Sequence, residues 1–190
     1  MSRRGWVPGG GFVLLIASWG GLAWFAAWGL QEPDLDRVWW ILEQADLGTA
    51  HVTWEDAELL ERCIARNPEI ALDRLGGKPV KLLERTSGGW TTGPVSYFFV
   101  APTGGAGLRL DVECRGAARY PARVLVEVGE LRGSLVFTGD GRESWVLPAS
   151  AGAFAAARPA LGRLVADTGF GCAAGADCPG VGLRLAGEPL

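Results

Sequence analysis

An uncharged stretch near the N-terminus constrains this chain more than any other feature. No Asp, Glu, Lys or Arg occurs between Gly5 and Gln31, and Val7–Leu30 consists mainly of apolar and small residues. Because an α-helix rises about 1.5 Å per residue, this stretch is long enough to cross a hydrocarbon core of about 30 Å with some tilt. The sequence therefore predicts a transmembrane anchor at residues 7–30.

The charges that flank this anchor predict its orientation. Arg3 and Arg4 precede it, whereas residues 31–50 are acidic and contain a single basic residue, Arg37. The positive-inside rule places residues 1–6 in the cytoplasm and the bulk of the chain on the other side. We therefore expect a single-pass protein of the bacterial inner membrane, with its domain in the periplasm.

A cleaved signal peptide is the alternative explanation of the apolar stretch. The apolar part of a signal peptide usually runs for about 7–15 residues and ends at a small-residue cleavage site. Here the stretch is longer, and the best cleavage site, just before Trp24, falls inside it. A retained anchor is therefore favoured, and the domain is exported in either case.

Small residues along the predicted anchor suggest a contact with another helix. Gly20, Ala23 and Ala27 share one helical stripe, and small residues on one face allow a neighbouring helix to approach closely. The alternative is composition alone, because the chain contains 29 glycines. The stripe predicts other membrane-protein subunits as partners.

The cysteines also point to an oxidising compartment. All four lie beyond the anchor, and an even number of cysteines in an exported domain favours disulfide bonds. Their spacing matches neither a redox C-x-x-C motif nor paired zinc ligands. A short loop between the last two would leave the first two to pair, although the connectivity stays open. The expected disulfide residues are Cys63, Cys114, Cys172 and Cys178.

Apolar residues recur at helical spacing in the first part of the exported region. Residues 31–50 form a predicted juxtamembrane amphipathic helix, which either lies on the membrane or docks on the domain. A second helix is expected to begin after Thr53, which can cap it, and to carry an ion pair between Glu58 and Arg62. A short helix should follow over residues 69–75.

The spacing changes to alternation after residue 80, which predicts strands. Gly129-Glu130 fits a tight turn that pairs Val128 with Leu131. A second turn at residues 139–141 extends this hairpin to a three-stranded meander over 122–147. The alanine-rich segments 149–157 and 160–166 are expected to be helical. Together these elements predict an α+β fold for the exported domain, residues 51–190, with strands at 80–83, 95–100, 108–114, 124–128 and 181–185.

Aromatic side chains gather in one predicted strand, at Tyr97, Phe98 and Phe99. A half-buried strand exposes every second side chain, so at least one of these rings should face solvent. Either both faces of the strand are covered, or an aromatic patch is available to a partner, as exposed apolar patches often are.

No motif predicts a catalytic residue, a cofactor or a metal site. His51 is the single histidine, and its neighbours include no recognisable nucleophile. The acids in residues 138–143 are too few for a calcium loop. Arg109, Asp111 and Glu113 alternate along one strand and are typical of a solvated face. Basic residues are scattered rather than clustered, which argues against nucleic acid as a partner.

The leading hypothesis is a non-enzymatic, membrane-anchored envelope protein that serves as an accessory or assembly subunit of a larger membrane complex. A first alternative is a periplasmic binding or sensing module for a small ligand or envelope polymer. This alternative predicts a concave, partly apolar pocket with a few convergent polar groups. A second alternative is an enzyme with an unrecognised site, which requires a cleft with carboxylates or His51 whose pKa values are shifted.

Overall fold

The computed structural model describes residues 35–47, 52–83, 89–104, 106–148, 158–171 and 180–190. No helix within these ranges is long and apolar enough to cross a membrane. The anchor expected at residues 7–30 lies outside the described residues, together with its small-residue stripe. His51, the segment 149–157, Cys172 and Cys178 also lie outside them.

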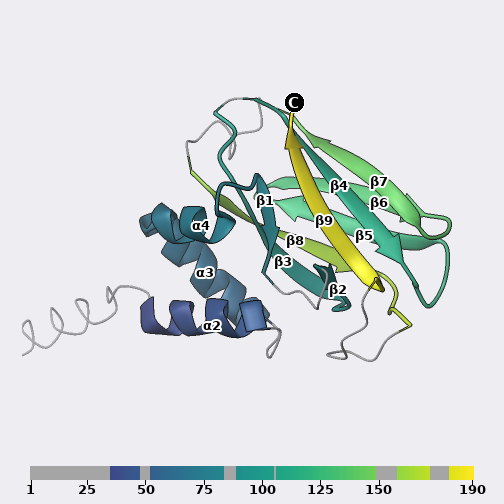
Figure 1. The fold of residues 1–190 in the computed structure, drawn as a ribbon, viewed down its shortest axis with the longest axis horizontal. Helices are drawn as coiled ribbons and strands as arrows, with labels where there is room; N and C mark the ends of the chain where they lie inside the picture. Colours follow the sequence, from purple (N-terminus) through teal and green to yellow (C-terminus); the bar gives the residue numbers. More distant parts are fainter. Residues whose placement is uncertain (1–34, 48–51, 84–88, 105, 149–157, 172–179) are drawn as a thin grey trace, which may run out of the picture. The chain divides into compact units, whose positions relative to one another are not determined.

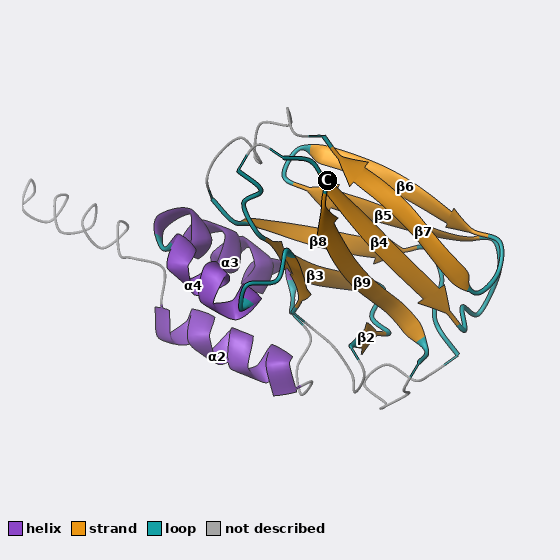
Figure 2. Cartoon of the chain, turned by 45° about the horizontal axis from the view of Figure 1, so that its top comes forward, coloured by secondary structure: helices purple, strands orange, loops and turns teal. Residues whose placement is uncertain are grey.

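Three helices and two antiparallel sheets form the described domain, which is therefore α+β as predicted. The helices lie beside β1 and β3 (Figures 1 and 2), on the outer face of a five-stranded sheet of order β1-β3-β8-β5-β6. The inner face of this sheet packs on a four-stranded sheet of order β2-β9-β4-β7. The elements are α2 (Leu35–Leu47), α3 (Trp54–Arg66), α4 (Pro68–Leu75), β1 (Val80–Leu82), β2 (Trp90–Thr91), β3 (Val95–Val100), β4 (Leu108–Arg115), β5 (Ala122–Val128), β6 (Leu131–Phe137), β7 (Gly141–Leu147), β8 (Ala160–Ala166) and β9 (Gly182–Pro189).

Local sequence signals account for the three helices. Thr53 caps α3 in a capping box, because its side chain accepts a hydrogen bond from the Asp56 backbone N–H while the Asp56 side chain accepts one from the Thr53 backbone. Gly76 ends α4 in the left-handed conformation, with φ of 56°. In α2, Val38 and Leu42 are buried in the same apolar cluster as α3. The predicted amphipathic helix thus docks on the domain.

The middle of β3 is covered on both faces. Phe98 points into the core between the two sheets, and Phe99 packs in the separate core beneath the helices. Both rings have 0% exposed surface, and Tyr97 has 6%. Of the two alternatives for this strand, the structure shows that both faces are covered: the facing sheet and the helix layer bury Tyr97, Phe98 and Phe99, so the predicted partner surface there is wrong.

The first predicted hairpin is confirmed, whereas the predicted meander is wrong. β5 and β6 pair with Val128 opposite Leu131, as the turn predicts. β7 instead leaves this sheet and pairs with β4, so that Trp145 lies opposite Leu110. The Trp145 ring packs across the interior onto Gly133, where an added Cβ would lie 2.4 Å from the ring. The alternation of apolar and polar residues shows which side chains of a strand are buried. It is the same whether the next strand is a hydrogen-bonded neighbour or a strand of the facing sheet, so it cannot distinguish the two.

The segment 160–166 is strand β8 and not the expected helix. It lies between β3 and β5 and is hydrogen-bonded to both. Leu164 and Ala166 point into the core between the sheets, and Gly162 lies against the Phe98 ring. Its alanines favour a helix locally. Pairing and packing with the two neighbouring strands outweigh that preference.

Cys63 and Cys114 are both buried and free. Cys63 lies in the core beneath the helices, and Cys114 lies in the core between the sheets. These cores are on opposite faces of the five-stranded sheet, so the expected bond between Cys63 and Cys114 is not formed. The periodicity of each segment indicates that its cysteine is buried, but it does not indicate in which core. Both cysteines can therefore be buried without lying close enough to form a disulfide.

Candidate ligand-binding cavity

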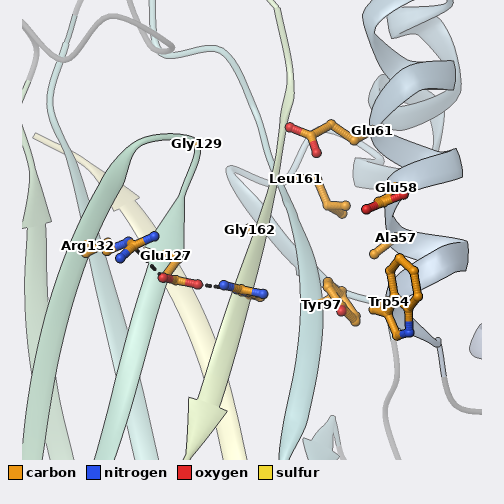
Figure 3. Close-up of a pocket in the computed structure, with 11 residues that line it drawn as sticks. Trp54, Ala57, Glu58, Glu61, Tyr97, Glu127, Gly129, Arg132, Leu161 and Gly162 are labelled. Carbon is orange, nitrogen blue, oxygen red and sulfur yellow. Dashed lines mark hydrogen bonds and ion pairs between the residues drawn. The ribbon is translucent and has the colours of Figure 1, made fainter.

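A cavity of about 290 Å³ opens where the helix layer ends on the outer face of the five-stranded sheet. One wall comes from α3, and the other comes from β3, β8, β5 and β6 (Figure 3). Its lining combines apolar, aromatic and charged groups. The lining residues are Trp54, Ala57, Glu58, Glu61, Tyr97, Glu127, Gly129, Arg132, Leu161, Gly162 and Arg163.

The α3 wall carries two carboxylates and an indole. Trp54, Glu58 and Glu61 follow one another at helical spacing on the face of α3 that borders the cavity. Trp54 is 62% exposed. In the part of the chain that the structure describes, neither glutamate has an ion-pair partner, and the expected pair between Glu58 and Arg62 is absent. Figure 3 shows both carboxylates projecting from α3 toward the sheet.

The sheet wall carries an arginine–glutamate–arginine triad. Glu127 on β5 lies directly opposite Arg132 on β6 and Arg163 on β8. Its Oε1 is 2.9 Å from the Nε of Arg132, and its Oε2 accepts a hydrogen bond from the Nε of Arg163 (Figure 3). The hydrogen bond to Glu127 is the main cause that raises the pKa of Arg163 above its ordinary value. Cross-strand register thus fixes all three side chains on one face.

Glu127 cannot accept hydrogen bonds from all the N–H donors of the two guanidinium groups. Each guanidinium has five N–H donors, and one carboxylate has about four acceptor positions for both. The Glu127 side chain is only 8% exposed, whereas those of Arg132 and Arg163 are 72% and 49% exposed. Donors of both arginines therefore remain available on the solvent side, and the triad has one net positive charge.

The aromatic side chains lie at one end of the cavity. Trp54 and Tyr97 are drawn close to one another beneath Ala57 in Figure 3. Leu161 adds an apolar surface from β8. The cavity thus combines an apolar surface, aromatic rings at one end and charged groups that converge on it. The hypothesis of a binding module requires this combination.

A second cavity of about 390 Å³ lies between α4, β1 and the end of β3. Leucine, proline and alanine dominate its lining, and Lys78 is its single charged residue within the described ranges. It therefore offers little that would orient a polar ligand, and the charged cavity is the better candidate site.

The charged strand residues considered from the sequence lie elsewhere. Asp111 accepts a hydrogen bond of 2.6 Å from Ser144 and lies 3.2 Å from Arg109. Glu113 pairs with Arg115 at 2.6 Å. These groups belong to β4 in the other sheet, where they balance one another. The structure differs from the solvated face that the alternation indicates, because Asp111 is buried, with 7% exposed surface, against these partners.

The loop of residues 138–143 has a structural role. The Asp140 carboxylate accepts hydrogen bonds from the Gly116 backbone N–H, at 2.9 Å, and from the Tyr120 hydroxyl. These bonds hold the pKa of Asp140 below its ordinary value, while desolvation and the bond to Asp140 raise the pKa of Tyr120 to about 12. Among the described residues, no group of three or more His, Cys, Asp or Glu side chains is placed to hold a metal ion.

Sequence reasoning missed the charged residues of the cavity. One signal was available, because the predicted hairpin places Glu127 opposite Arg132. Arg163 gives no such signal, because the sequence of its segment predicts a helix and not a strand. Comparison with known proteins adds no family: no protein-family model matches the chain, and no curated protein matches its sequence.

Proposed function

We propose that this chain is a membrane-anchored, non-enzymatic binding module that holds a small polar ligand in the cavity between α3 and the five-stranded sheet. The observation that carries the proposal is the convergence of five charged side chains and two aromatic rings on one cavity. Its volume of about 290 Å³ lies at the lower end of the range for small-molecule sites. Residues 7–30 would anchor the module, with its domain in the periplasm.

The chemistry of the lining favours binding over catalysis. Among the described residues that border the cavity, the polar side-chain groups are carboxylates, guanidinium groups, the Tyr97 phenol and the Trp54 indole N–H. Covalent catalysis generally uses a nucleophile next to a base, and general acid–base work uses a group with a suitably shifted pKa. Glu127, the carboxylate on the sheet wall, is already bound by two arginines.

A thermal-shift experiment on the full chain in mild detergent tests this proposal. The probes are one compound of each charge type: glutarate, putrescine and L-alanyl-L-alanine. A ligand that binds only the folded state raises the melting temperature as its concentration exceeds Kd. We expect at least one probe to do so, and expect Trp54→Ala to abolish the shift. Trp40→Ala is the matched control, because Trp40 is also exposed, at 49%, but lies on α2. No shift with any probe would refute the proposal.

An accessory subunit of a larger membrane complex is the second candidate. It is favoured by α2, whose Trp39 and Trp40 are 41% and 49% exposed, because exposed tryptophans are common anchors of protein interfaces. Purification from membranes in mild detergent tests it: a membrane subunit should co-purify, and Trp39→Ala with Trp40→Ala should release it. Elution of the intact chain as a lone monomer would contradict this candidate.

A further inference from the structure

The two walls of the cavity carry opposite charges. Glu58 and Glu61 make the α3 wall negative, because no cation within the described residues pairs with them. Arg132 and Arg163 make the sheet wall positive, because Glu127 balances only one of their two charges. A ligand that carries charge of one sign would be attracted by one wall and repelled by the other.

The positive wall suits a carboxylate. Both arginines contact Glu127 through Nε, and the Nη ends of a guanidinium form the planar fork that binds a carboxylate with two parallel hydrogen bonds. Because the two side chains are 72% and 49% exposed, a ligand can reach these donors without displacing Glu127. Glu127 acts here as a positioning residue, because each of its two carboxylate oxygens holds one guanidinium group, Arg132 on one side and Arg163 on the other.

The negative wall suits an ammonium group. Glu58 and Glu61 lie one helical turn apart and border the same cavity as the exposed indole of Trp54. An ammonium group gains from carboxylate acceptors and from the face of an indole ring within about 6 Å. Carboxylates and an aromatic surface on one wall therefore recognise a cation better than a neutral donor.

We propose that the cavity selects a small zwitterion of amino-acid to dipeptide size. Its carboxylate binds Arg132 and Arg163, and its ammonium group faces Glu58 and Glu61 beside Trp54. This inference rests on the proposed binding function and adds the chemical class of the ligand. The cavity volume of about 290 Å³ limits the ligand to a few heavy-atom groups between the two charges.

Blocking each charge of one probe separates the two contacts. Calorimetric titration of the full chain in detergent would use L-alanyl-L-alanine, its N-acetyl derivative and its C-terminal amide. The acetyl derivative lacks the ammonium group, and the amide lacks the carboxylate. We expect each derivative to bind about tenfold or more weakly than the dipeptide, because each loses one set of charge-assisted hydrogen bonds.

Variants then assign each contact to its wall. The double variant Glu58→Gln with Glu61→Gln should bind the dipeptide about tenfold more weakly and should no longer distinguish it from the acetyl derivative. Arg132→Gln should likewise remove the distinction between the dipeptide and its amide. Such non-additive losses are the signature of a direct pair. Glu55→Gln and Arg62→Gln are the matched controls on α3, because neither residue borders the cavity.

The possible results distinguish a failure of the zwitterion assignment from a failure of the proposed binding function. If glutarate or putrescine binds as tightly as the dipeptide, the cavity binds ligands but the zwitterion assignment is overturned. Equal affinities for the dipeptide and both blocked derivatives would overturn it as well. If none of these compounds binds, the proposed binding function fails together with the inference.

Discussion

Single side chains of this domain show how burial and hydrogen bonding set the behaviour of ionisable groups. Tyr120 is the clearest case, because desolvation and its bond to Asp140 raise its pKa to about 12 from 10.0. A raised pKa means that the folded state holds the phenol proton more tightly than the unfolded state. The stabilisation is therefore complete below pH 10 and is lost as the pH rises toward 12.

Tyr120→Phe should flatten part of this alkaline loss of stability. The variant cannot ionise at this position, so its free energy of unfolding should fall less steeply than that of the wild type between about pH 10 and 12. Chemical denaturation at several pH values measures the difference. Other groups titrate in the same range in both proteins, so their effects cancel. Parallel curves would contradict the assignment.

Glu127→Gln tests the triad on the sheet wall. Loss of the negative charge leaves Arg132 and Arg163, on the two strands that flank β5, without the carboxylate that lies between them. Because both arginines are partly solvated, we expect a loss of about 1–2 kcal/mol in the free energy of unfolding, below the cost for a fully buried pair. Urea denaturation measures it. Glu130→Gln, in the adjacent turn, is the control and should change stability by less than about 0.5 kcal/mol.

Among the secondary-structure elements, β7 and β8 decide the architecture. β8 lies between β3 and β5 and completes the five-stranded sheet. β7 follows β6 in the sequence but belongs to the four-stranded sheet. Close approaches of rings to glycine backbone mark both: Phe98 lies on Gly162, and Trp145 lies on Gly133. Phe98 and Gly162 are cross-strand partners within the five-stranded sheet. The contact of Trp145 with Gly133 joins the two sheets, and a larger residue at Gly133 would push them apart.

Gly133→Ala should therefore destabilise the domain. The added Cβ would lie 2.4 Å from the Trp145 ring, and such overpacking typically costs about 1–3 kcal/mol. Thermal or urea unfolding provides the measurement. Gly139→Ala is the matched control, because nothing lies within 4 Å of its added Cβ. Equal stability of the two variants would argue against the packing of β7 over β6.

The whole molecule keeps its two described thiols in separate cores. Cys63 and Cys114 are both buried, and burial raises the pKa of each thiol. Both properties slow alkylation, because the thiolate is the reactive form and must be exposed. The remaining cysteines, Cys172 and Cys178, are proposed to form the disulfide expected of an exported domain.

Alkylation of protein isolated from membranes checks this distribution. Without denaturant, we expect no modified cysteine. In denaturant without reductant, Cys63 and Cys114 should be modified, and all four cysteines of the chain should react after reduction. Mass spectrometry of the peptides gives the assignment. Modification of Cys172 and Cys178 in denaturant without reductant would contradict both the disulfide and the oxidising compartment.

The sequence alone determined the elements whose signals are local. The capping box at Thr53 and the Gly129-Glu130 turn act within a few residues, so α3 and the β5–β6 hairpin, including the pairing of Glu127 with Arg132, follow from pattern. Tertiary structure decided which strands become neighbours. Alternation does not specify a partner strand, so the sheet of β7, the strand state of β8 and the burial of Phe98 and Phe99 depended on distant contacts. The cavity depended on them too, since Arg163 meets Glu127 only when β8 enters the sheet.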